Sequence, residues 1–259
     1  MEVQKMIVMK FGGAAVATAG SFHRIAAIIA DARKEHQCPI VVVVSAMANA
    51  TDQLLSLAKE VHPNPPRREQ DMLISVGERI SIALLAMALE LKGVDAVSFT
   101  GSQSGIITDE CHAEASIVEV KPWRILRALN EGKVVIVAGF QGVSRTGEIT
   151  TLGRGGSDTS AVAIAAALKV SCVDFYKDVD GIYWSDPKKD GNAKKMEKME
   201  YTEAKKLAEG GAKVLHLSSI LLAEKNGVQL NVRSFYKPDE IGTIVGNSSL
   251  NDNIIYEGE

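Results

Sequence analysis

A glycine-rich stretch over residues 153–158 combines an arginine with an acidic side chain. The guanidinium of Arg154 can hold a carboxylate or a phosphate through two hydrogen bonds. A glycine-rich turn before a helix also presents free N–H groups and the positive end of the helix dipole, which favours an anion. Asp158 would repel an anion, so it suits an ammonium ligand or the orientation of a lysine. Taken alone, an ordinary turn before a helix capped by Ser157 or Asp158 explains the stretch equally well.

A lysine at the end of an apolar run forms a second candidate group. Lys10 is followed closely by Gly12 and Gly13, so an ammonium and exposed backbone amides could meet a phosphate there. On its own, such a segment is usually a turn. The common GxxxxGK[ST] and GxGxxG signatures are absent, which excludes the two best-known nucleotide-binding motifs. The five histidines are scattered without metal-ligand spacing, so no protein metal site is predicted.

The hydrophobic pattern indicates the scaffold that must position these groups. Continuous β-branched runs over 39–44 and 133–138 are typical of parallel strands buried on both faces. They alternate with helix-like segments along the chain, which predicts an α/β fold: a three-layer αβα sandwich around a central, mostly parallel sheet. Ligands bind at the carboxyl ends of strands in such folds. Five polar or glycine-bearing segments fall at predicted strand ends: 10–13, 45–51, 139–142, 154–158 and 177–183.

Several element boundaries follow from the same pattern. Ser21 is expected to cap a helix over 22–35, and one unbroken helix is expected over 68–91. Residues 101–105 are expected to form a loop, and 106–108 and 116–120 short strands of a flap. A later helix is predicted over 213–225. The polar composition after residue 246 predicts a loose tail over 247–259.

Bulk composition excludes several classes of protein. The chain has 259 residues, 46% of them hydrophobic, and a formal net charge of −3, so nucleic acid is not expected as a partner. Its three cysteines form no CxxC pair, which favours a reducing compartment. We find no signal peptide and no uncharged apolar run near the ~20 residues that span a bilayer. A cytoplasmic protein without membrane contact is expected.

Seven short motifs follow one another along the chain. They are Lys10-Phe11-Gly12-Gly13, Val44-Ser45-Ala46 with Thr51, Ser75-Val76-Gly77-Glu78, Gly153-Arg154-Gly155-Gly156-Ser157-Asp158, Asp178-Val179-Asp180-Gly181-Ile182-Tyr183 with Asp186-Pro187, Gly211-Ala212-Lys213-Val214-Leu215-His216 and Val232-Arg233-Ser234. In this combination and order they resemble the aspartate kinases of the amino acid kinase superfamily. The resemblance runs from about residue 3 to residue 245 and implies the amino acid kinase fold.

The resemblance implies an activity and a set of site residues. The activity is ATP-dependent phosphorylation of the β-carboxylate of L-aspartate to 4-phospho-L-aspartate, the first step of the lysine, threonine and methionine pathway. Mg²⁺ would be held mainly by phosphate oxygens, so no protein metal ligands are implied. The implied catalytic residues are Lys10, Asp158 and Lys213. The implied substrate-binding residues are Ser45, Thr51, Glu78, Arg154, Gly156 and Ser157. The implied ATP-binding residues are Lys10, Gly12, Gly13, Lys177, Asp178, Tyr183, Lys188 and Lys213.

Glu78 illustrates how the resemblance and the bare sequence differ. It lies in a long apolar helical segment, where the resemblance implies that it binds the ammonium group of the substrate. A solvated helix face, or an ion pair with the adjacent Arg79, is the simpler alternative.

The resemblance also implies a domain organisation. Residues 1–246 would form the catalytic domain, with a substrate lobe over about 1–150 and a nucleotide lobe over about 151–246. A homodimer is expected. The ACT domains that aspartate kinases usually carry are not present in this sequence, which fits either a naturally short form or a truncated one.

Four departures from the pattern of the resembled family affect five positions. Ala14 and Ala15 replace hydroxyl side chains, Lys177 replaces a usual Thr, Lys188 a usual Arg, and Leu217 a usual Pro. Losing a hydroxyl that binds a charged group costs about 1.5–3 kcal/mol. Two alternatives therefore stay open: a kinase for another amino or carboxylic acid, and a catalytically weak ligand-binding subunit that regulates a partner.

Overall fold

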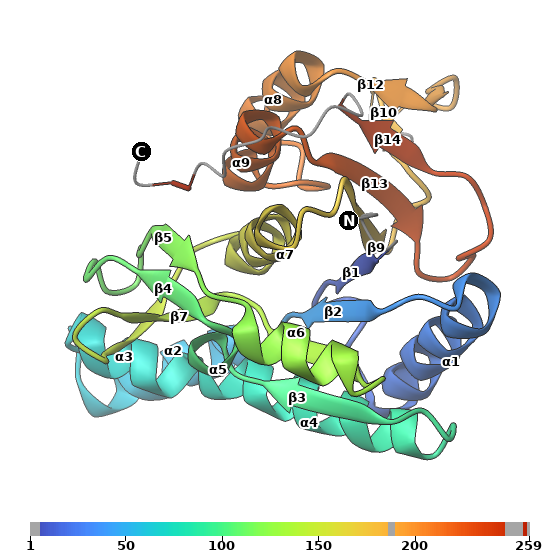
Figure 1. Ribbon diagram of the computed structural model, residues 1–259. Coiled ribbons are helices and arrows are strands. Elements are labelled where there is room, and N and C mark those ends of the chain that lie inside the picture. The colour runs from blue at the N-terminus through green and yellow to red at the C-terminus, as the bar shows by residue number, and fades with distance from the viewer. Residues whose placement is uncertain (1–5, 186–189, 247–255, 258–259) are drawn as a thin grey trace.

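A central sheet forms the middle layer of the fold (Figure 1). The computed structural model describes residues 6–185, 190–246 and 256–257. In these residues the sheet has eight strands in the order β12-β14-β13-β9-β1-β2-β6-β3. All neighbouring strands are parallel except β13 and β14, which are antiparallel. The strands are β1 (Ile7–Phe11), β2 (Ile40–Val44), β3 (Ala96–Phe99), β6 (Val134–Ala138), β9 (Cys172–Lys177), β12 (Lys198–Met199), β13 (Gln229–Ser234) and β14 (Thr243–Val245). The predicted mostly parallel sheet is confirmed.

Helices cover both faces of this sheet. Figure 1 shows α1 (Ala19–His36) and α7 (Gly156–Ala167) on opposite sides of β1 and β2. Val42 and Val44 belong to the core that contains α1 and α4 (Val76–Glu90), whereas Val41 and Val43 belong to the core that contains α7. Because successive side chains of a strand point to opposite faces, a strand covered on both sides must be apolar throughout. The continuous valine run therefore has its expected cause.

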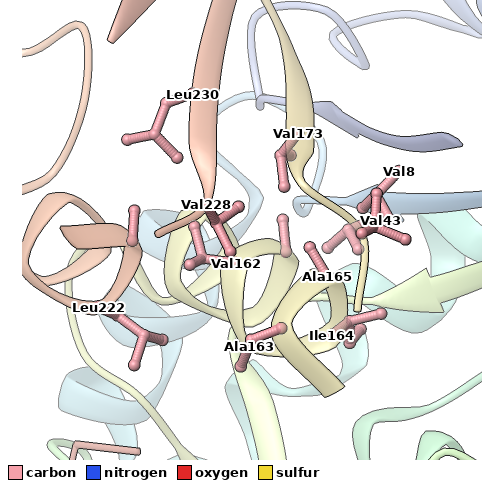
Figure 2. Packing of buried hydrophobic residues seen from close by; sticks show 14 of the residues in the cluster. Val8, Val43, Val162, Ala163, Ile164, Ala165, Val173, Leu222, Val228 and Leu230 are labelled. Atoms are coloured by element: carbon pink, nitrogen blue, oxygen red, sulfur yellow. The ribbon is translucent and has the colours of Figure 1, made fainter. Parts of the chain in front are cut away.

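Helix α7 is the central buried helix of the second core. Figure 2 shows Val162 and Ile164 among valines of β1, β2 and β9. Residues 156–166 are all buried, so the helix has no solvated face to orient it. Its small side chains let it lie close to three strands at once, which places its N-terminus at the carboxyl ends of β1 and β9.

A smaller sheet packs beside the main one. Its order is β5-β4-β7-β8, with β4 (Ile106–Thr108), β5 (Ile117–Val120), β7 (Gln141–Ser144) and β8 (Ile149–Thr151). The predicted flap strands are confirmed, and β7 and β8 were not predicted. The remaining elements are α2 (Ala50–Val61), α3 (Arg67–Ile74), α5 (Gly101–Ser104), α6 (Trp123–Asn130), α8 (Tyr201–Glu209), α9 (Leu217–Asn226) and the β10 (Ile182–Tyr183) and β11 (Lys195–Met196) hairpin.

Two predicted helix starts are wrong by a few residues. Helix α1 begins at residue 19, because Thr18 rather than Ser21 is the cap: the Thr18 hydroxyl accepts a hydrogen bond from the Ser21 N–H at 3.3 Å. Helix α9 begins at Leu217 and not at 213. Lys213 is consequently left in the connection before the helix.

Two further segments also differ from the prediction. The helix predicted over 68–91 is interrupted at Ser75, which separates α3 from α4. The Ser75 carbonyl accepts a hydrogen bond from the Gln141 side chain at 2.8 Å. The predicted loop after Phe99 is the one-turn helix α5, because Thr100 and Gln103 form a capping box.

The stretch Arg67–Glu90 is long and apolar enough to cross a membrane, by length and composition alone. Half of its most apolar window is buried inside the fold, and α4 packs against α1, β3 and β6. The core therefore accounts for about half of this apolar stretch.

Two residues near the C-terminus contradict the expectation of a loose tail. Tyr256 is buried in the core beside α7. The backbone N–H of Glu257 donates to the Ile117 carbonyl at 3.1 Å, and its carboxylate accepts from the Ile117 N–H at 2.8 Å. The rest of the predicted tail lies outside the described residues. The predicted division into two lobes near residue 150 stays a prediction. Strands from both predicted lobes belong to one sheet, because β9 pairs with β1 and β13 pairs with β9.

Candidate active site

A cleft of about 780 Å³ opens at the carboxyl ends of β1, β2 and β9, beside the N-terminus of α7. It brings together most of the residues predicted from the sequence. The predicted residues that line it are Lys10, Gly12, Gly13, Ser45, Thr51, Glu78, Arg154, Gly156, Ser157, Asp158, Lys177, Asp178 and Lys213.

Two predicted nucleotide residues are not placed in the cleft. Tyr183 does not line it, and its hydroxyl donates to the Asp180 carboxylate at 3.1 and 3.2 Å. Lys188 lies outside the described residues.

Lys10 lies in the strand at the centre of the cleft floor. In β1 it pairs with Val43 of β2 and with Phe175 of β9. Parallel strands end at one edge of a sheet, so the next residues of all three strands meet around its ammonium group. The residue is only 4% exposed.

The carboxylate of Asp158 holds two ammonium groups. Lys10 Nζ lies 2.5 Å from Oδ1, and Lys177 Nζ lies 2.9 Å from Oδ2 and 3.3 Å from Oδ1. Burial would raise the pKa of Asp158, but the charges of Lys10 and Lys177 outweigh it and hold that pKa well below its usual range. Burial lowers the pKa of Lys10 to about 8, an effect that Asp158 opposes and Lys177 increases. The predicted orientation of a lysine by Asp158 is what the structure shows.

The N-terminus of α7 is capped differently from the prediction. Gly155 is its N-cap, in the left-handed conformation at φ 76°, and no side chain caps the helix. Ser157 and Asp158 lie inside the first turn, so the expectation that one of them is the cap is wrong. A Cβ at Gly155 would lie 2.1 Å from the His216 ring. Glycine is therefore required both by the backbone angle and by the contact with His216.

Glu78 faces the cleft from the first turn of α4. It is 2% exposed, and its Oε1 accepts a hydrogen bond from the Ala46 N–H at 2.9 Å, whereas its Oε2 has no partner among the described residues. Burial raises the pKa of Glu78 to about 7, which the Ala46 amide partly opposes. A Cβ at Gly77 would lie 2.8 Å from that of Ala46, so the glycine permits this close approach. The alternatives of a solvated face and of an ion pair with Arg79 are both wrong.

The cleft also contains cations that no acid neutralises in the described part of the chain. Arg154 and Lys213 are exposed, both line the cleft, and neither has an ion pair there. A cleft that contains both a buried acid and exposed cations without an ion pair among the described residues suits a ligand that carries charges of both signs.

Two contributors were missed by the sequence reasoning. His216, expected to be structural, lines the cleft as the N-cap of α9, and burial lowers its pKa. Asp71 is fully buried in α3 and accepts hydrogen bonds from the Thr151 hydroxyl at 2.6 Å, His112 Nδ1 at 2.8 Å and the Ala113 N–H at 3.1 Å. Ala113 lines the cleft at a φ of 71°. An aspartate in the polar helix segment 67–71 gives no sequence signal of such a role.

The described residues contain no group of three or more His, Cys, Asp or Glu side chains that could hold a metal ion. In the cleft, the carboxylate of Asp158 already binds two ammonium groups. The donor set therefore suits a cation that arrives bound to phosphate oxygens rather than one held by the protein alone.

Comparisons with known proteins agree with this geometry. The pattern of the amino acid kinase family matches residues 5–234. An aspartokinase of Corynebacterium glutamicum is 50% identical over 244 residues, which are 94% of this chain and 58% of that protein. An aspartokinase of Geobacillus stearothermophilus is 48% identical over 255 residues, 98% of this chain and 62% of that protein. The chain thus spans about three fifths of the length of these relatives.

Solved structures give the same relationship. The aspartate kinase from Synechocystis has a TM-score of 0.84 and 45% identity, over 96% of this chain and 40% of that one. Aspartokinase III of E. coli, solved with aspartate and ADP, has a TM-score of 0.84 and 29% identity, over 95% of this chain and 66% of that one. A UMP kinase from Bacillus anthracis, at 20% identity and a TM-score of 0.67, shares the fold alone. The chain belongs to the amino acid kinase family.

Proposed function

We propose that this chain phosphorylates the β-carboxylate of L-aspartate with ATP, giving 4-phospho-L-aspartate and ADP. The observation that carries the proposal is the buried carboxylate of Glu78, with one oxygen unpartnered among the described residues, in the same cleft as Arg154, which has no ion pair among those residues. The identity of about one half to aspartokinases supports it, as does the likeness to an aspartokinase solved with aspartate and ADP. The product would enter lysine, threonine and methionine synthesis.

The two ends of the amino acid are recognised by groups of opposite charge. Oε2 of Glu78 accepts hydrogen bonds from the substrate ammonium, which supplies the partner that this buried oxygen lacks among the described residues. Arg154 binds the α-carboxylate through its planar fork. Ser45 and Thr51, which line the same cleft, add hydroxyl donors. The side-chain carboxylate is then left to face the Lys10 side of the cleft.

The reaction needs charge neutralisation and positioning more than proton transfer. An oxygen of the aspartate carboxylate forms a bond to the γ-phosphorus, while the bond from that phosphorus to the bridging oxygen breaks and its electrons stay on ADP. The attacking carboxylate is already ionised, so no general base is required. Lys10 and Lys213 neutralise the phosphoryl oxygens, and Asp158 keeps Lys10 in place. Gly12 and Gly13 let the backbone approach the phosphates.

Magnesium enters this scheme through the nucleotide. Bound Mg²⁺ would neutralise charge on the phosphate oxygens that hold it. Asp178, an acid that also lines the cleft and has no ion pair among the described residues, is a candidate for an outer contact to that ion. The predicted roles of Lys188 and Tyr183 toward ATP stay predictions.

Trapping of the acyl phosphate tests the proposal. The folded protein is incubated with MgATP, L-aspartate and hydroxylamine, and aspartyl hydroxamate is measured. Hydroxamate formation with aspartate supports the proposal, and none at high protein concentration contradicts it. A panel of other amino and dicarboxylic acids in the same assay tests a second candidate function, a kinase for a different acceptor. That candidate is favoured by Ala14 and Ala15, whose methyl groups line the cleft where the resembled family has hydroxyls.

We also propose a cytoplasmic homodimer. Large exposed apolar side chains recur at intervals of four or seven residues along α3 and α4 and at the C-cap of α4: Met72, Val76, Ile80, Met87 and Leu91 are 40–78% exposed. Such spacing places side chains on one helix face, and an exposed apolar stripe of this kind marks an interaction surface. Nε of Arg79 beside it is buried without a partner in the described residues, which a second copy of the chain would supply.

A further inference from the structure

The end of β9 carries a second lysine whose ammonium group forms an ion pair with Asp158. Lys177 Nζ lies 2.9 Å from Asp158 Oδ2, and its side chain is 14% exposed. The same carboxylate binds Lys10 through Oδ1. Both lysines and Asp158 line the cleft. One acid therefore serves two buried cations.

This arrangement leaves an uncompensated charge in the cleft. Two ammonium groups and one carboxylate sum to one positive charge, at a place where all three side chains are 14% exposed or less. The other charged or titratable groups that line the cleft are Arg154, Lys213, His216, Asp52, Glu78, Asp178 and Tyr176. Of these, Glu78 is close enough to Lys10 for the charge of that lysine to oppose the rise that burial causes in the pKa of Glu78, whereas burial and the charges of Asp158, Lys177, Lys10 and Arg154 all change the pKa of His216. A buried excess of positive charge is costly unless an anion completes it.

We propose that Lys177 is a second phosphate-binding cation of this site, and that Asp158 is a counter-ion shared by Lys10 and Lys177 that keeps both ammonium groups aimed at the phosphates of ATP. The proposal rests on the proposed function, because it assigns the phosphates to this end of the cleft. Without Asp158 the two cations would repel each other and separate. With it, each lysine keeps donor hydrogens free for phosphate oxygens, because an ammonium has three donors.

Lys177 can also replace the phosphate-binding donors that Ala14 and Ala15 lack. Hydroxyl groups at those positions would donate to phosphate, whereas the methyl groups cannot. An ammonium within the same cleft supplies a stronger, charge-assisted donor. It comes from a position where the resembled family has a Thr, so the site exchanges hydroxyl donors for one additional cation.

The experiment compares wild-type protein with Lys177→Met, which keeps the length of the side chain and removes its charge. Lys92→Met, on an exposed lysine far from the cleft residues, is the control. Dissociation constants for MgATP and for L-aspartate are measured by calorimetry, independently of turnover. We expect the MgATP constant to rise about ten- to a hundredfold in Lys177→Met and the aspartate constant to stay within about twofold.

A second readout separates phosphate binding from a merely structural role. Lys177 is one of the groups that lower the pKa of Lys10, so its removal should raise the pH above which MgATP binding is lost. If Lys177 only neutralised the charge of Asp158, Lys177→Met would lower the melting temperature. The dissociation constant for MgATP and its dependence on pH would then stay unchanged, and this result would overturn the proposal. If Lys177→Met does not fold, Lys177→Thr is used instead. An unchanged dissociation constant for MgATP in that variant would also overturn the proposal.

The outcomes also distinguish failure of the proposed function. Should wild-type protein bind MgATP but form no aspartyl phosphate, the assignment of the acceptor fails while the comparison of MgATP binding still decides the role of Lys177. Should wild-type protein not bind MgATP at all, both proposals are wrong.

Discussion

At the scale of single residues, Glu78 connects burial to substrate choice. Its carboxylate lies in an apolar wall with one oxygen unpartnered in the described residues, and burial raises its pKa to about 7. An ammonium ligand binds the ionised form, so ionisation must precede or accompany binding below that pH. We expect the dissociation constant of aspartate to rise by up to about tenfold per pH unit as the pH falls below 7.

Calorimetric titration of aspartate between pH 5.5 and 8.5 measures this dependence. Glu78→Gln should weaken binding at every pH and flatten the profile, whereas Glu90→Gln, on an exposed residue of the same helix, should leave it unchanged. The pKa of Glu78 in the folded protein, about 7, lies above its ordinary value of 4.5, so the native state binds one more proton than the unfolded state between these pH values. The contribution of Glu78 to the free energy of unfolding should therefore fall as the pH rises from 4.5 through 7. An equally steep aspartate profile in Glu78→Gln would contradict the role of Glu78.

The site could be predicted at this scale wherever a side chain has one obvious chemistry. Lys10, Arg154 and Asp158 could be singled out as charges beside glycines at predicted strand ends, and the family resemblance implied their roles. The ion pair between Lys177 and Asp158 could not be predicted, because the position of Lys177 in the sequence does not show the direction of its side chain. His216 and Asp71 were missed for the same reason: their importance comes from contacts with residues far away in sequence.

At the scale of elements, the approach of α7 to α9 depends on Gly155. The residue combines a positive φ with a position against the His216 ring. We expect Gly155→Ala to lower the free energy of unfolding by about 3 kcal/mol, because backbone strain and a steric clash add. It should also displace Arg154 and so raise the aspartate KM.

Gly147→Ala is the matched control for this change. Gly147 has a φ of 92° but nothing within 4 Å of the site of a Cβ, so only the strain of about 1 kcal/mol applies. Chemical denaturation of the two variants measures the difference. Equal losses of stability in the two variants would show that the His216 ring can move away from an added Cβ, and that the contact with His216 does not require glycine at position 155.

The hydrogen bonds of Asp71 join three elements, α3, β8 and the connection between β4 and β5. Asp71→Ala would leave the Thr151 hydroxyl and the Ala113 N–H without this acceptor. We expect the free energy of unfolding to fall by at least about 2 kcal/mol and the aspartate KM to rise, because Ala113 lines the cleft. Glu69→Ala, on the exposed side of α3, should change both within about 0.5 kcal/mol and twofold. Denaturation and steady-state kinetics test this, and a stable variant with a normal KM would show that the cluster does not position the cleft.

Buried strands were predictable at this scale and caps were not. The valine runs of β2 and β6 are apolar on both faces, which leaves few alternatives to a parallel strand. Helix starts depend on which of several neighbouring hydroxyls turns back onto the backbone, so Thr18 and Ser21 cannot be separated by type. Strands β7 and β8 were missed because Gly142 and the polar residues around them resemble a turn.

At the scale of the whole molecule, the exposed apolar stripe of α3 and α4 predicts association. A charge within it should separate the proposed dimer, because an unpaired charge is expensive to bury at an interface. We expect Ile80→Asp to shift the protein from dimer to monomer in sedimentation velocity. Ile241→Asp, at an exposed isoleucine away from the stripe, is the control and should leave the mass unchanged. A wild-type monomer at micromolar concentration would contradict the proposal.

The chemistry of the whole molecule is tested most directly by stoichiometry. ADP and aspartyl hydroxamate are measured in the same reaction of wild-type protein and of Lys10→Ala, with binding of aspartate to both followed by calorimetry. The proposed mechanism predicts one hydroxamate for each ADP in the wild type. For Lys10→Ala it predicts a rate at least about a hundredfold lower with aspartate binding retained. ADP formed without hydroxamate, or near-normal turnover in Lys10→Ala, would contradict it.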